Sequence, residues 1–387
     1  MKVCFDTFGC RLNKAEALQM EAAFIARGWQ SVPDHAQADL IVVRGCSVTA
    51  RAQHESEKAI AHIRAKYPGK RIVATGCIKT KINEFWLKDL DYATPEKTAR
   101  AYLKVQDGCS CACSFCIVPQ FRGKSESLDF DLVLERAREF CDAGYREIVV
   151  TGCNLSSYRS QGRDLAQLVA ALADINTGVR IRLGSVEPGE AALRLIDEMA
   201  RHENICRFLH LAIQSGSTSI LSRMRRPYTI KAVDAAINTA LDKMPHISIS
   251  CDLMTGFPGE TDLDFLATKM LLKRFPIAKA HIFPYSERPG TAAALFNNQI
   301  PQEIRHARAH EIAELADAQR SRLAKRFIGS TVEIVVEEGK SLSGWTGEYF
   351  WCSAYKNPLE REAPKRKDLV KMKIVSAYGH QLYGIKV

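Results

Sequence analysis

The chain has 387 residues, of which 46% are hydrophobic and 25% are charged, as in an ordinary globular protein of two or three domains. This composition excludes a disordered or collagen-like chain, and the longest apolar runs are too short to span a membrane. The start carries charge at Lys2 and Asp6 and lacks the apolar core of a signal peptide, so we expect a cytoplasmic protein.

Two features of the composition bear on function. The formal net charge is +10, which suits an anionic partner such as nucleic acid, although many soluble enzymes share such an excess. The cysteine count is 13, which is high and odd. Disulfide frameworks belong to short secreted chains, so clustered cysteines here favour metal binding or redox chemistry.

The first part of the chain alternates strands with helices. The expected elements, beginning with a strand, are 3–7, 13–27, 40–43, 50–66 and 71–75. This alternation predicts a parallel sheet with helical crossovers. Such a sheet binds ligands beyond the carboxyl ends of its strands.

Cysteines follow each of these three strands, in each case directly after a glycine: Cys10, Cys46 and Cys77. Parallel topology places the three sulfurs along one edge of the sheet. We also expect each to stand near the start of a helix, whose dipole favours a thiolate. The sequence therefore predicts a shared metal site; the alternative is three buried structural cysteines.

The middle of the chain repeats the alternation over a greater length. Strands are expected at 102–105, 147–151, 180–185, 208–213, 247–254 and 279–284, with helices at 128–142, 164–174, 190–200, 230–243 and 261–273. Six strand–helix units predict a partial parallel barrel, which carries its chemistry at the carboxyl ends of the strands.

After a long charged helix at 301–326, the last segment changes character. Short strands at 331–336, 369–375 and 381–387 with turns between them predict a small antiparallel barrel. The segment contains aromatic residues and a basic run, namely Trp345, Tyr349, Phe350, Trp351, Tyr355, Lys365, Arg366 and Lys367. This mixture suits stacking on RNA bases, but an ordinary barrel core with a solvated basic face is the alternative.

A compact cysteine motif follows the first barrel strand. Cys109, Cys113 and Cys116 have the spacing C-x3-C-x2-C, and three thiolates leave one iron of a four-iron cluster open to a small molecule. Structural zinc needs four closed ligands, and Cys111 is available as the fourth. The position at the carboxyl end of a barrel strand favours the iron–sulfur cluster.

This motif resembles the radical S-adenosylmethionine (SAM) enzymes. Together with the N-terminal cysteines and the C-terminal barrel, the whole chain resembles the methylthiotransferase family, and its tail resembles that family's TRAM domain. The supporting stretches are Thr7–Asn13, Gly45–Arg51, Gly76-Cys77, Asp107–Cys109, Ser185–Pro188, Gln214–Ser217, Met224–Arg226, Gly256–Thr261, Phe283–Ser286 and Gly344–Tyr349. The resemblance implies three domains, at 1–95, 96–327 and 328–387, with the last binding RNA.

The resemblance also implies two [4Fe–4S] clusters and SAM as cofactors. Cys109, Cys113 and Cys116 would ligate the cluster that binds SAM, and Cys10, Cys46 and Cys77 the second cluster, which receives the sulfur. SAM serves both as methyl donor and as the source of a 5′-deoxyadenosyl radical, with electrons from a reduced flavodoxin- or ferredoxin-like protein. Such insertion at an unreactive carbon needs cofactor chemistry.

Further contacts to SAM are expected at the ends of the barrel strands. The candidates are Phe115 for the adenine, Gly152 for the amino group, Ser185 and Glu187 for the ribose or amino group, Gln214, and Arg225 with Arg226 for the carboxylate or a substrate phosphate. The alternative for these residues is turn geometry or a solvated face. The turn at 256–260 is expected to flank the adenine.

The family modifies either adenosine beside the tRNA anticodon or an aspartate of a ribosomal protein. Gly9-Cys-Arg-Leu-Asn13 resembles the subgroup acting on N6-threonylcarbamoyladenosine, so we expect a tRNA anticodon stem-loop as partner. Isopentenyladenosine, the ribosomal aspartate and a non-catalytic zinc-bearing RNA-binding protein are the alternatives. Two departures stand out: only 32 positions separate Cys77 from Cys109, which suggests a trimmed N-terminal sheet, and Cys111 lies inside the cluster loop.

Overall fold

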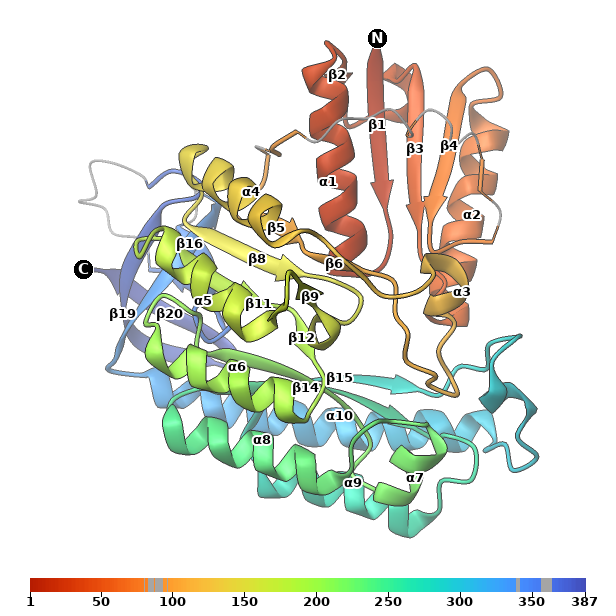
Figure 1. The fold of residues 1–387 in the computed structure, drawn as a ribbon, viewed down its shortest axis with the longest axis vertical. Helices are drawn as coiled ribbons and strands as arrows, with labels where there is room; N and C mark the ends of the chain where they lie inside the picture. The colour runs from red at the N-terminus through yellow and green to blue at the C-terminus, as the bar shows by residue number, and fades with distance from the viewer. Residues whose placement is uncertain (80, 83–86, 88–92, 96, 339–341, 356–363) are drawn as a thin grey trace.

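The computed structural model describes the chain except residues 80, 83–86, 88–92, 96, 339–341 and 356–363 (Figure 1). The shortened segment after Cys77 and the expected boundary at 95–96 include residues outside the described part. The described residues form an N-terminal parallel sheet, a partial barrel in the middle and a closed barrel at the C-terminus. This confirms the α/β class and the order of its three architectures. None of the described helices combines the length and hydropathy that a membrane crossing requires.

The N-terminal sheet has the strand order β2-β1-β3-β4, and all its pairs are parallel. Its strands are β1 (Lys2–Thr7), β2 (Gln30–Ser31), β3 (Leu40–Gly45) and β4 (Arg71–Gly76), with helices α1 (Arg11–Ala26) and α2 (Ala50–Lys66). Every residue of β3 is buried because helices cover both faces of the sheet. The carboxyl ends of β1, β3 and β4 point toward the central barrel (Figure 1).

The central part contains two parallel sheets, β11-β8-β5 and β12-β13-β14-β15. The strands are β5 (Ala101–Lys104), β8 (Glu147–Thr151), β11 (Arg180–Leu183), β12 (Ser185–Val186), β13 (Phe208–Gln214), β14 (Ser248–Thr255) and β15 (Ile277–Pro284). The six expected strands are present, although the third is split at Gly184 into β11 and β12. Two short antiparallel pairs lie in its loops. They are β6 (Gln106–Asp107) with β7 (Glu126–Ser127), and β9 (Arg159–Ser160) with β10 (Arg163–Asp164).

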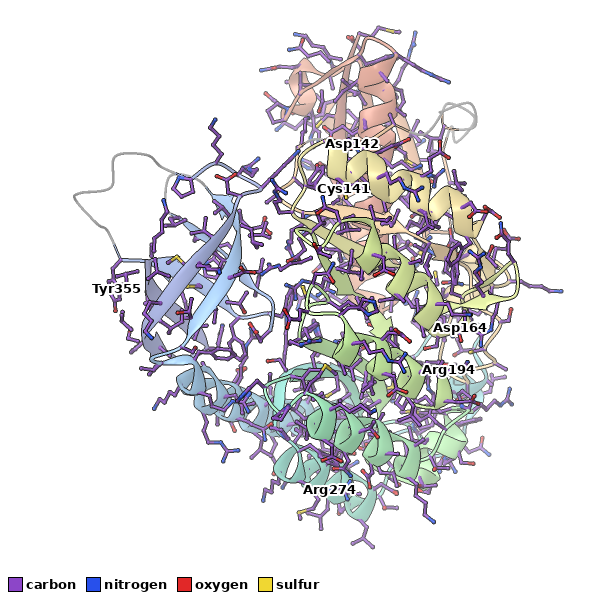
Figure 2. All side chains as sticks on the ribbon, turned by 60° about the vertical axis from the view of Figure 1, so that its left-hand side comes forward. Cys141, Asp142, Asp164, Arg194, Arg274 and Tyr355 are labelled. Atoms are coloured by element: carbon purple, nitrogen blue, oxygen red, sulfur yellow. The ribbon has the colours of Figure 1, made fainter. Side chains whose placement is uncertain are left out.

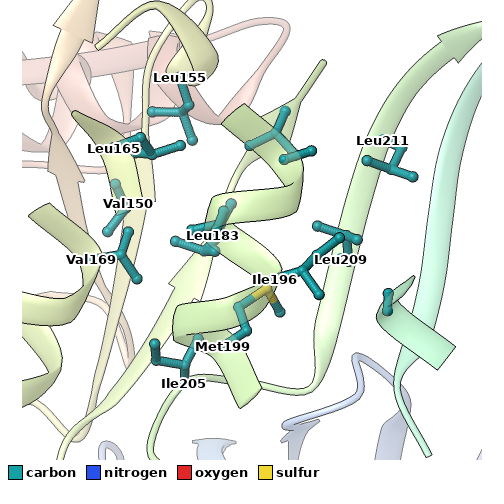
Figure 3. Close-up of a cluster of buried hydrophobic side chains, with 14 of the residues drawn as sticks. Val150, Leu155, Leu165, Val169, Leu183, Ile196, Met199, Ile205, Leu209 and Leu211 are labelled. Atoms are coloured by element: carbon teal, nitrogen blue, oxygen red, sulfur yellow. The ribbon is translucent and has the colours of Figure 1, made fainter. Parts of the chain in front are cut away.

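Helices cover the outer side of the partial barrel. They are α4 (Phe130–Asp142), α5 (Leu165–Ile175), α6 (Glu190–Arg201), α8 (Ile230–Lys243), α9 (Asp262–Arg274) and α10 (Gln302–Ala324), with the short helices α3 (Val118–Arg122) and α7 (Thr218–Arg223) in loops. Their apolar faces meet the strands in one core, in which Leu183 lies beside Ile196 and Leu209 (Figure 3). This core fixes the strand ends from which the candidate site is built.

The C-terminal strands close into a barrel of order β16-β17-β18-β20-β19. Their bounds are β16 (Thr331–Glu338), β17 (Ser343–Thr346), β18 (Trp351–Ala354), β19 (Leu369–Tyr378) and β20 (Gln381–Lys386). The expected barrel is present, but β18 and β20 pair in parallel. A hairpin pairs β19 antiparallel with β20, so β20 closes the barrel in the same direction as β18.

A buried carboxylate holds this barrel to the central part. Glu147 on β8 is fully buried and accepts hydrogen bonds from Arg180 and Arg182 of β11. The same two guanidinium groups donate to main-chain carbonyl oxygens of the C-terminal barrel, including those of Glu333 at 2.8 Å and Thr346 at 2.7 Å. Burial opposes ionisation of Glu147, but Arg182 and Arg180 hold its pKa well below the usual value.

Candidate functional site

The carboxyl edge of the N-terminal sheet brings together Cys10, Cys46 and Cys77, which we call the sheet triad. Gly9 has φ +91°, and a Cβ built on it would lie 2.7 Å from Cys46 Sγ, so the strand ends approach only because this residue is glycine. Cys77 N donates to the carbonyl oxygen of Gly45 at 3.1 Å, which ties the third strand end to the second. The sequence therefore predicted the right edge for these sulfurs.

The helix-start expectation holds only in part. Cys10 is the N-cap residue of α1, whereas α2 begins four residues after Cys46 and has Thr49 as its N-cap. Among the described residues no helix starts directly after Cys77. Burial, and secondarily the nearby Cys10 thiol, raises the pKa of both Cys46 and Cys77. These thiols are thus poor free nucleophiles and would ionise when bound to a metal.

Arg122, at the end of α3, joins the sheet triad to the central barrel. Its Nε donates to Cys77 Sγ at 2.9 Å, and its Nη1 donates to Asp107 at 2.9 Å. Its remaining donors reach Asn13 and Glu16 on α1, and the side chain is only 7% exposed. Because α3 directly follows the cluster loop, one guanidinium group contacts a sheet-triad sulfur and the entry of that loop. The sequence analysis missed this residue.

The loop after β6 carries Cys109, Cys113 and Cys116, which we call the loop triad. Gly108 at φ +63° lets the chain pass close to Lys124, whose carbonyl oxygen lies 1.8 Å from a built Cβ. Main-chain hydrogen bonds close the loop. Cys109 N donates to the carbonyl oxygen of Gly123 at 3.1 Å, and Cys116 N donates to that of Cys113 at 3.2 Å. Burial raises the pKa of Cys116 to about 11.

Cys111 lies beside the loop triad and touches several of its polar neighbours. Its thiol hydrogen-bonds Cys109, which lowers the pKa of Cys109 to about 6 and raises that of Cys111. Its Sγ lies 3.4 Å from Asn154 Nδ2 and 4.0 Å from Glu187 Oε2. Cys111 is therefore held next to the triad by side chains from two other strand ends.

Arg226 contacts the loop triad as Arg122 contacts the sheet triad. Its Nη1 donates to Cys113 Sγ at 3.0 Å, and its Nη2 donates to Glu187 at 2.7 Å. Arg225, the first arginine of the expected pair, is exposed and has φ +56°, so the tight turn points its side chain away from the triad. The Met224-Arg-Arg226 motif marked the position, but the turn that selects Arg226 is not readable from the sequence.

The other expected contacts surround the same strand ends. Phe115 packs edge-on against Phe257 with ring centroids 6.4 Å apart, and the main-chain N–H of Glu187 donates to Ser156 Oγ at 2.8 Å. Gly152 lies against Gln106, and the expected turn is closed by Gly256 N donating to Glu260 at 2.7 Å. Ser185 is exposed at the start of β12, and Gln214 ends β13 with φ +71°.

The aromatic residues of the C-terminal barrel do not form the expected stacking surface. Phe350 is 1% exposed and belongs to the barrel core. Trp345 stacks on Tyr349 at 4.4 Å, and Tyr349 packs on Phe208 of the central barrel at 4.7 Å. The expectation was wrong for Phe350, which fills the barrel core, whereas Trp345 and Tyr349 use ring faces on each other and Tyr349 also packs on the central barrel. Tyr355 is 48% exposed at the outer edge of the barrel (Figure 2).

The donor set fits iron–sulfur clusters and a polar ligand. Each triad presents three thiols, and in each triad an arginine donates to one sulfur. Beside the loop triad, Asn154 Oδ1 is buried without a hydrogen-bond partner, while its Nδ2 faces Cys109 and Cys111. An orphaned buried acceptor at this place is what a bound donor group such as the SAM ammonium would satisfy.

Family models divide the chain at the same two regions. Residues 103–272 match the radical SAM superfamily, and residues 2–94 match a model described as uncharacterized protein family UPF0004. Among solved structures, the radical SAM methyltransferase TsrM of Kitasatospora setae superposes with a TM-score of 0.56 at 12% identity, covering 76% of this chain and 77% of that one. The fold and the cysteine motif thus define a radical SAM enzyme, whose cofactors are SAM and [4Fe–4S] clusters.

Similarity to curated proteins shows to which family of radical SAM enzymes the chain belongs. The threonylcarbamoyladenosine tRNA methylthiotransferase MtaB of Aquifex aeolicus is 30% identical, covering 89% of this chain and 95% of its own length. The MtaB of Chlamydia pneumoniae is 32% identical, with 85% of each chain covered. The tRNA-2-methylthio-N(6)-dimethylallyladenosine synthase of Methylibium petroleiphilum is 30% identical, with coverage of 99% and 96%. This chain belongs to the methylthiotransferase family of radical SAM enzymes, so it is an enzyme and not a zinc-bearing binding protein.

Proposed function

We propose that this enzyme inserts a methylthio group at C2 of N6-threonylcarbamoyladenosine 37 in tRNA, using two [4Fe–4S] clusters and two molecules of SAM. The observation that carries the proposal is the pair of cysteine triads, each at a strand-end edge and each contacted by one arginine. A methyltransferase needs no second triad, whereas sulfur insertion needs a site that holds the incoming sulfur.

The loop triad would ligate the SAM-binding cluster and the sheet triad the second cluster. When bound, these groups supply a 5′-deoxyadenosyl radical and a sulfur atom for transfer. The chain's own part is to hold both triads at facing edges, with Arg122 and Arg226 neutralising thiolate charge. Glu187 and Asn154, beside the loop triad, are placed to orient the polar end of SAM.

The choice of substrate rests on the relatives and on the start of α1. The MtaB proteins of Aquifex aeolicus and Chlamydia pneumoniae carry threonylcarbamoyladenosine in their names. The relative from Methylibium petroleiphilum, named for dimethylallyladenosine, is equally similar, so dimethylallyladenosine in tRNA is the second candidate. The basic balance of the chain, +10, supports a tRNA anticodon stem-loop as the partner. A flavodoxin- or ferredoxin-like protein is proposed as electron donor.

Nucleoside mass spectrometry tests the reaction. The protein is expressed in a host strain that lacks its own methylthiotransferases, and tRNA digests are compared with those of the strain without the protein. We expect methylthio-threonylcarbamoyladenosine to appear only with the protein. Appearance of the methylthio-dimethylallyl nucleoside instead would select the second candidate. If both products are absent, the proposal is refuted.

Single cysteine variants test the two-cluster assignment. Cys113→Ala should abolish SAM cleavage, because it removes a ligand of the SAM-binding cluster. Cys46→Ala should leave cleavage partly intact but remove the methylthio product, because it disrupts only the sulfur-holding cluster. The measurements are 5′-deoxyadenosine release and iron content of the anaerobically reconstituted protein, with about eight irons expected for the wild type and about four for each variant. Equal loss of both activities in both variants would contradict separate clusters.

A further inference from the structure

Tyr349 lies where all three parts of the chain meet. It has φ +67°, and its ring packs on Trp345 of its own barrel and on Phe208 of β13. Three cationic side chains from other parts approach the same ring, and one of them, Arg182, is already paired with Glu147. The Arg11 guanidinium carbon lies 5.0 Å from the ring centroid, and Lys279 Nζ of β15 lies 4.9 Å from it. Arg11 directly follows Cys10 of the sheet triad, so this cluster of charges stands beside that triad.

Lys279 and His281 face the inside of the partial barrel. Alternate side chains of β15 point to opposite sides, and Ala278, Ala280 and Ile282 pack into the apolar cores on the helical side. Lys279 and His281 must therefore point the other way, and His281 indeed packs edge-on against His210 of β13 at 5.5 Å. Lys279 thus lines the interior from the amino-terminal half of β15, while Arg11 reaches it from beside Cys10 of the sheet triad.

These cations lack a negative partner among the described residues. Neither Arg11 nor Lys279 forms an ion pair or a side-chain hydrogen bond there, although both side chains are partly buried. The interior carboxylate nearest in the sheet, Asp252, is engaged by His210 Nε2 at 3.1 Å. A second acid, Asp317, lies near Arg320 and His380 and offsets their positive charge. Partly buried positive charges without counter-ions are costly unless a ligand supplies the negative charge.

The charge balance of the interior agrees with a missing anion. Burial, helped by the neighbouring charges of Arg320 and Arg11, lowers the pKa of Lys279. Burial and Lys279 lower the pKa of His281 to about 4, so this ring is neutral at pH 7 and can donate a hydrogen bond without adding charge. Binding of an anion beside Lys279 would remove this electrostatic penalty.

We propose that Arg11 and Lys279, with Tyr349 between them, form a subsite for a carboxylate group of the substrate nucleoside. This inference rests on the proposed tRNA methylthiotransferase activity and assigns its specificity. The threonylcarbamoyl group ends in a carboxylate, whereas the dimethylallyl group is apolar and would leave both cations unpaired. Discrimination of this kind is strong, because a site with buried polar groups rejects a substrate that cannot pair with them.

Two anticodon stem-loops test the subsite. One carries threonylcarbamoyladenosine, and the other carries the same nucleoside with its carboxylate converted to the neutral amide. Methylthiolation kinetics and RNA affinity in fluorescence anisotropy are measured for the reconstituted wild type and for Lys279→Met, which keeps the apolar stem of lysine. We expect the wild type to favour the carboxylate about ten- to hundredfold in kcat/KM, and Lys279→Met to lose most of that preference.

Matched variants separate charge from folding. Lys279→Arg keeps the charge and should retain the preference, and Arg11→Gln should reduce it. Lys231→Met removes one exposed lysine from the outer helix α8 and should behave as the wild type. SAM cleavage and the iron–sulfur absorption spectrum should be unchanged in all of them, which shows intact clusters.

The outcomes distinguish this inference from the function on which it rests. If the wild type methylthiolates neither RNA, the proposed function fails. If it modifies both equally well, the function stands and the subsite is refuted. If Lys279→Met weakens both RNAs by the same factor, the lysine binds a backbone phosphate, and the carboxylate assignment is likewise overturned.

Discussion

Two arginines place a positive charge on one sulfur of each cysteine triad. Arg122 donates to Cys77 at 2.9 Å and Arg226 donates to Cys113 at 3.0 Å. Both guanidinium groups are nearly buried and are held by carboxylates, Glu16 for the first and Glu187 for the second. Charged donors to cluster sulfurs raise the reduction potential because they stabilise the added electron.

The variants Arg122→Lys and Arg226→Lys should therefore act on different clusters. Each variant keeps the positive charge but loses the planar guanidinium group, whose several N–H donors reach a sulfur and a carboxylate at the same time. We expect about ten- to hundredfold lower product formation in both, as is usual for partners of metal ligands. Potentiometric titration followed by electron paramagnetic resonance should show a more negative potential for one cluster in each variant. Each variant is the control for the other, and a shift of the same cluster in both would contradict this assignment.

At the residue scale the sequence located the cysteine triads better than the side chains that contact them. Cys10, Cys46 and Cys77 could be located because parallel strands place their carboxyl ends together. Arg122 lies 45 positions from the cysteine that it contacts, and Arg226 lies 113 positions from its own. No local pattern reports such contacts, and they depend on how the two edges face each other.

The helix α9 shows how an element is fixed beside the site. Thr261 and Asp264 form a capping box at its start, each side chain accepting from the other's main-chain N–H. Asp264 also accepts from Ser217 Oγ at 2.5 Å and Ser219 Oγ at 2.7 Å, which ties α9 to the start of α7. Although burial opposes it, these hydrogen bonds lower the pKa of Asp264 to about 2.

Asp264→Asn should weaken this end of α9 by about 1–2 kcal/mol at pH 6, because the bonds lose their charge. A carboxyl group whose pKa falls on folding stabilises the native state above its unfolded pKa. That contribution is lost as the pH falls from about 4 toward 2. Hydrogen exchange of the α9 amides should thus show a smaller difference between variant and wild type at pH 3. The control is Asp262→Asn, whose carboxylate is 98% exposed and should matter little.

At this scale the hydrophobic pattern predicted nearly all long elements. The alternation of strand and helix in the first 284 residues was sufficient to predict these elements, because apolar residues are spaced differently in buried parallel strands and in amphipathic helices. The exceptions are the short pieces, such as β2, α3 and α7, and the parallel pairing of β18 with β20. Strands of four residues carry too little pattern to fix their partner, and closure of the barrel decides it.

Among the described residues, polar contacts join the parts of the molecule at an N-terminal and a C-terminal junction, which differ in character. At the N-terminal side, Lys104 reaches Glu16 at 2.6 Å, and Ser286 Oγ accepts from the start of α2 at 3.0 Å. At the C-terminal side, Glu147 pairs with Arg180 and Arg182, which also donate hydrogen bonds to carbonyl oxygens of the C-terminal barrel. The first junction lies beside the triads, whereas the second is a buried network that includes none of the triad cysteines. The second can therefore be altered without touching a cluster ligand.

Glu147→Gln should loosen the C-terminal barrel from the rest of the protein. The variant leaves the guanidinium groups of Arg180 and Arg182 buried without their counter-ion, which costs about 3–5 kcal/mol. Calorimetry should then show a transition at lower temperature, by about 5 °C or more, and the C-terminal barrel should become sensitive to limited proteolysis. Product formation on tRNA should fall further than SAM cleavage, because the barrel supplies Tyr349 to the interior while the loop triad stays in place.

Glu337→Gln is the matched control for this junction. Glu337 pairs with Arg100 at 2.6 Å between the same two parts, but its side chain is 24% exposed, so water can replace the lost charge at a cost of about 0–1 kcal/mol. If both variants melt at the same temperature, the buried carboxylate does not hold the barrel. A drop in SAM cleavage as large as the drop in product would instead mean that the network supports the central barrel itself. If Glu147→Gln lowers product formation more than SAM cleavage, the C-terminal barrel positions the substrate, and the buried Glu147 carboxylate holds the barrel in place.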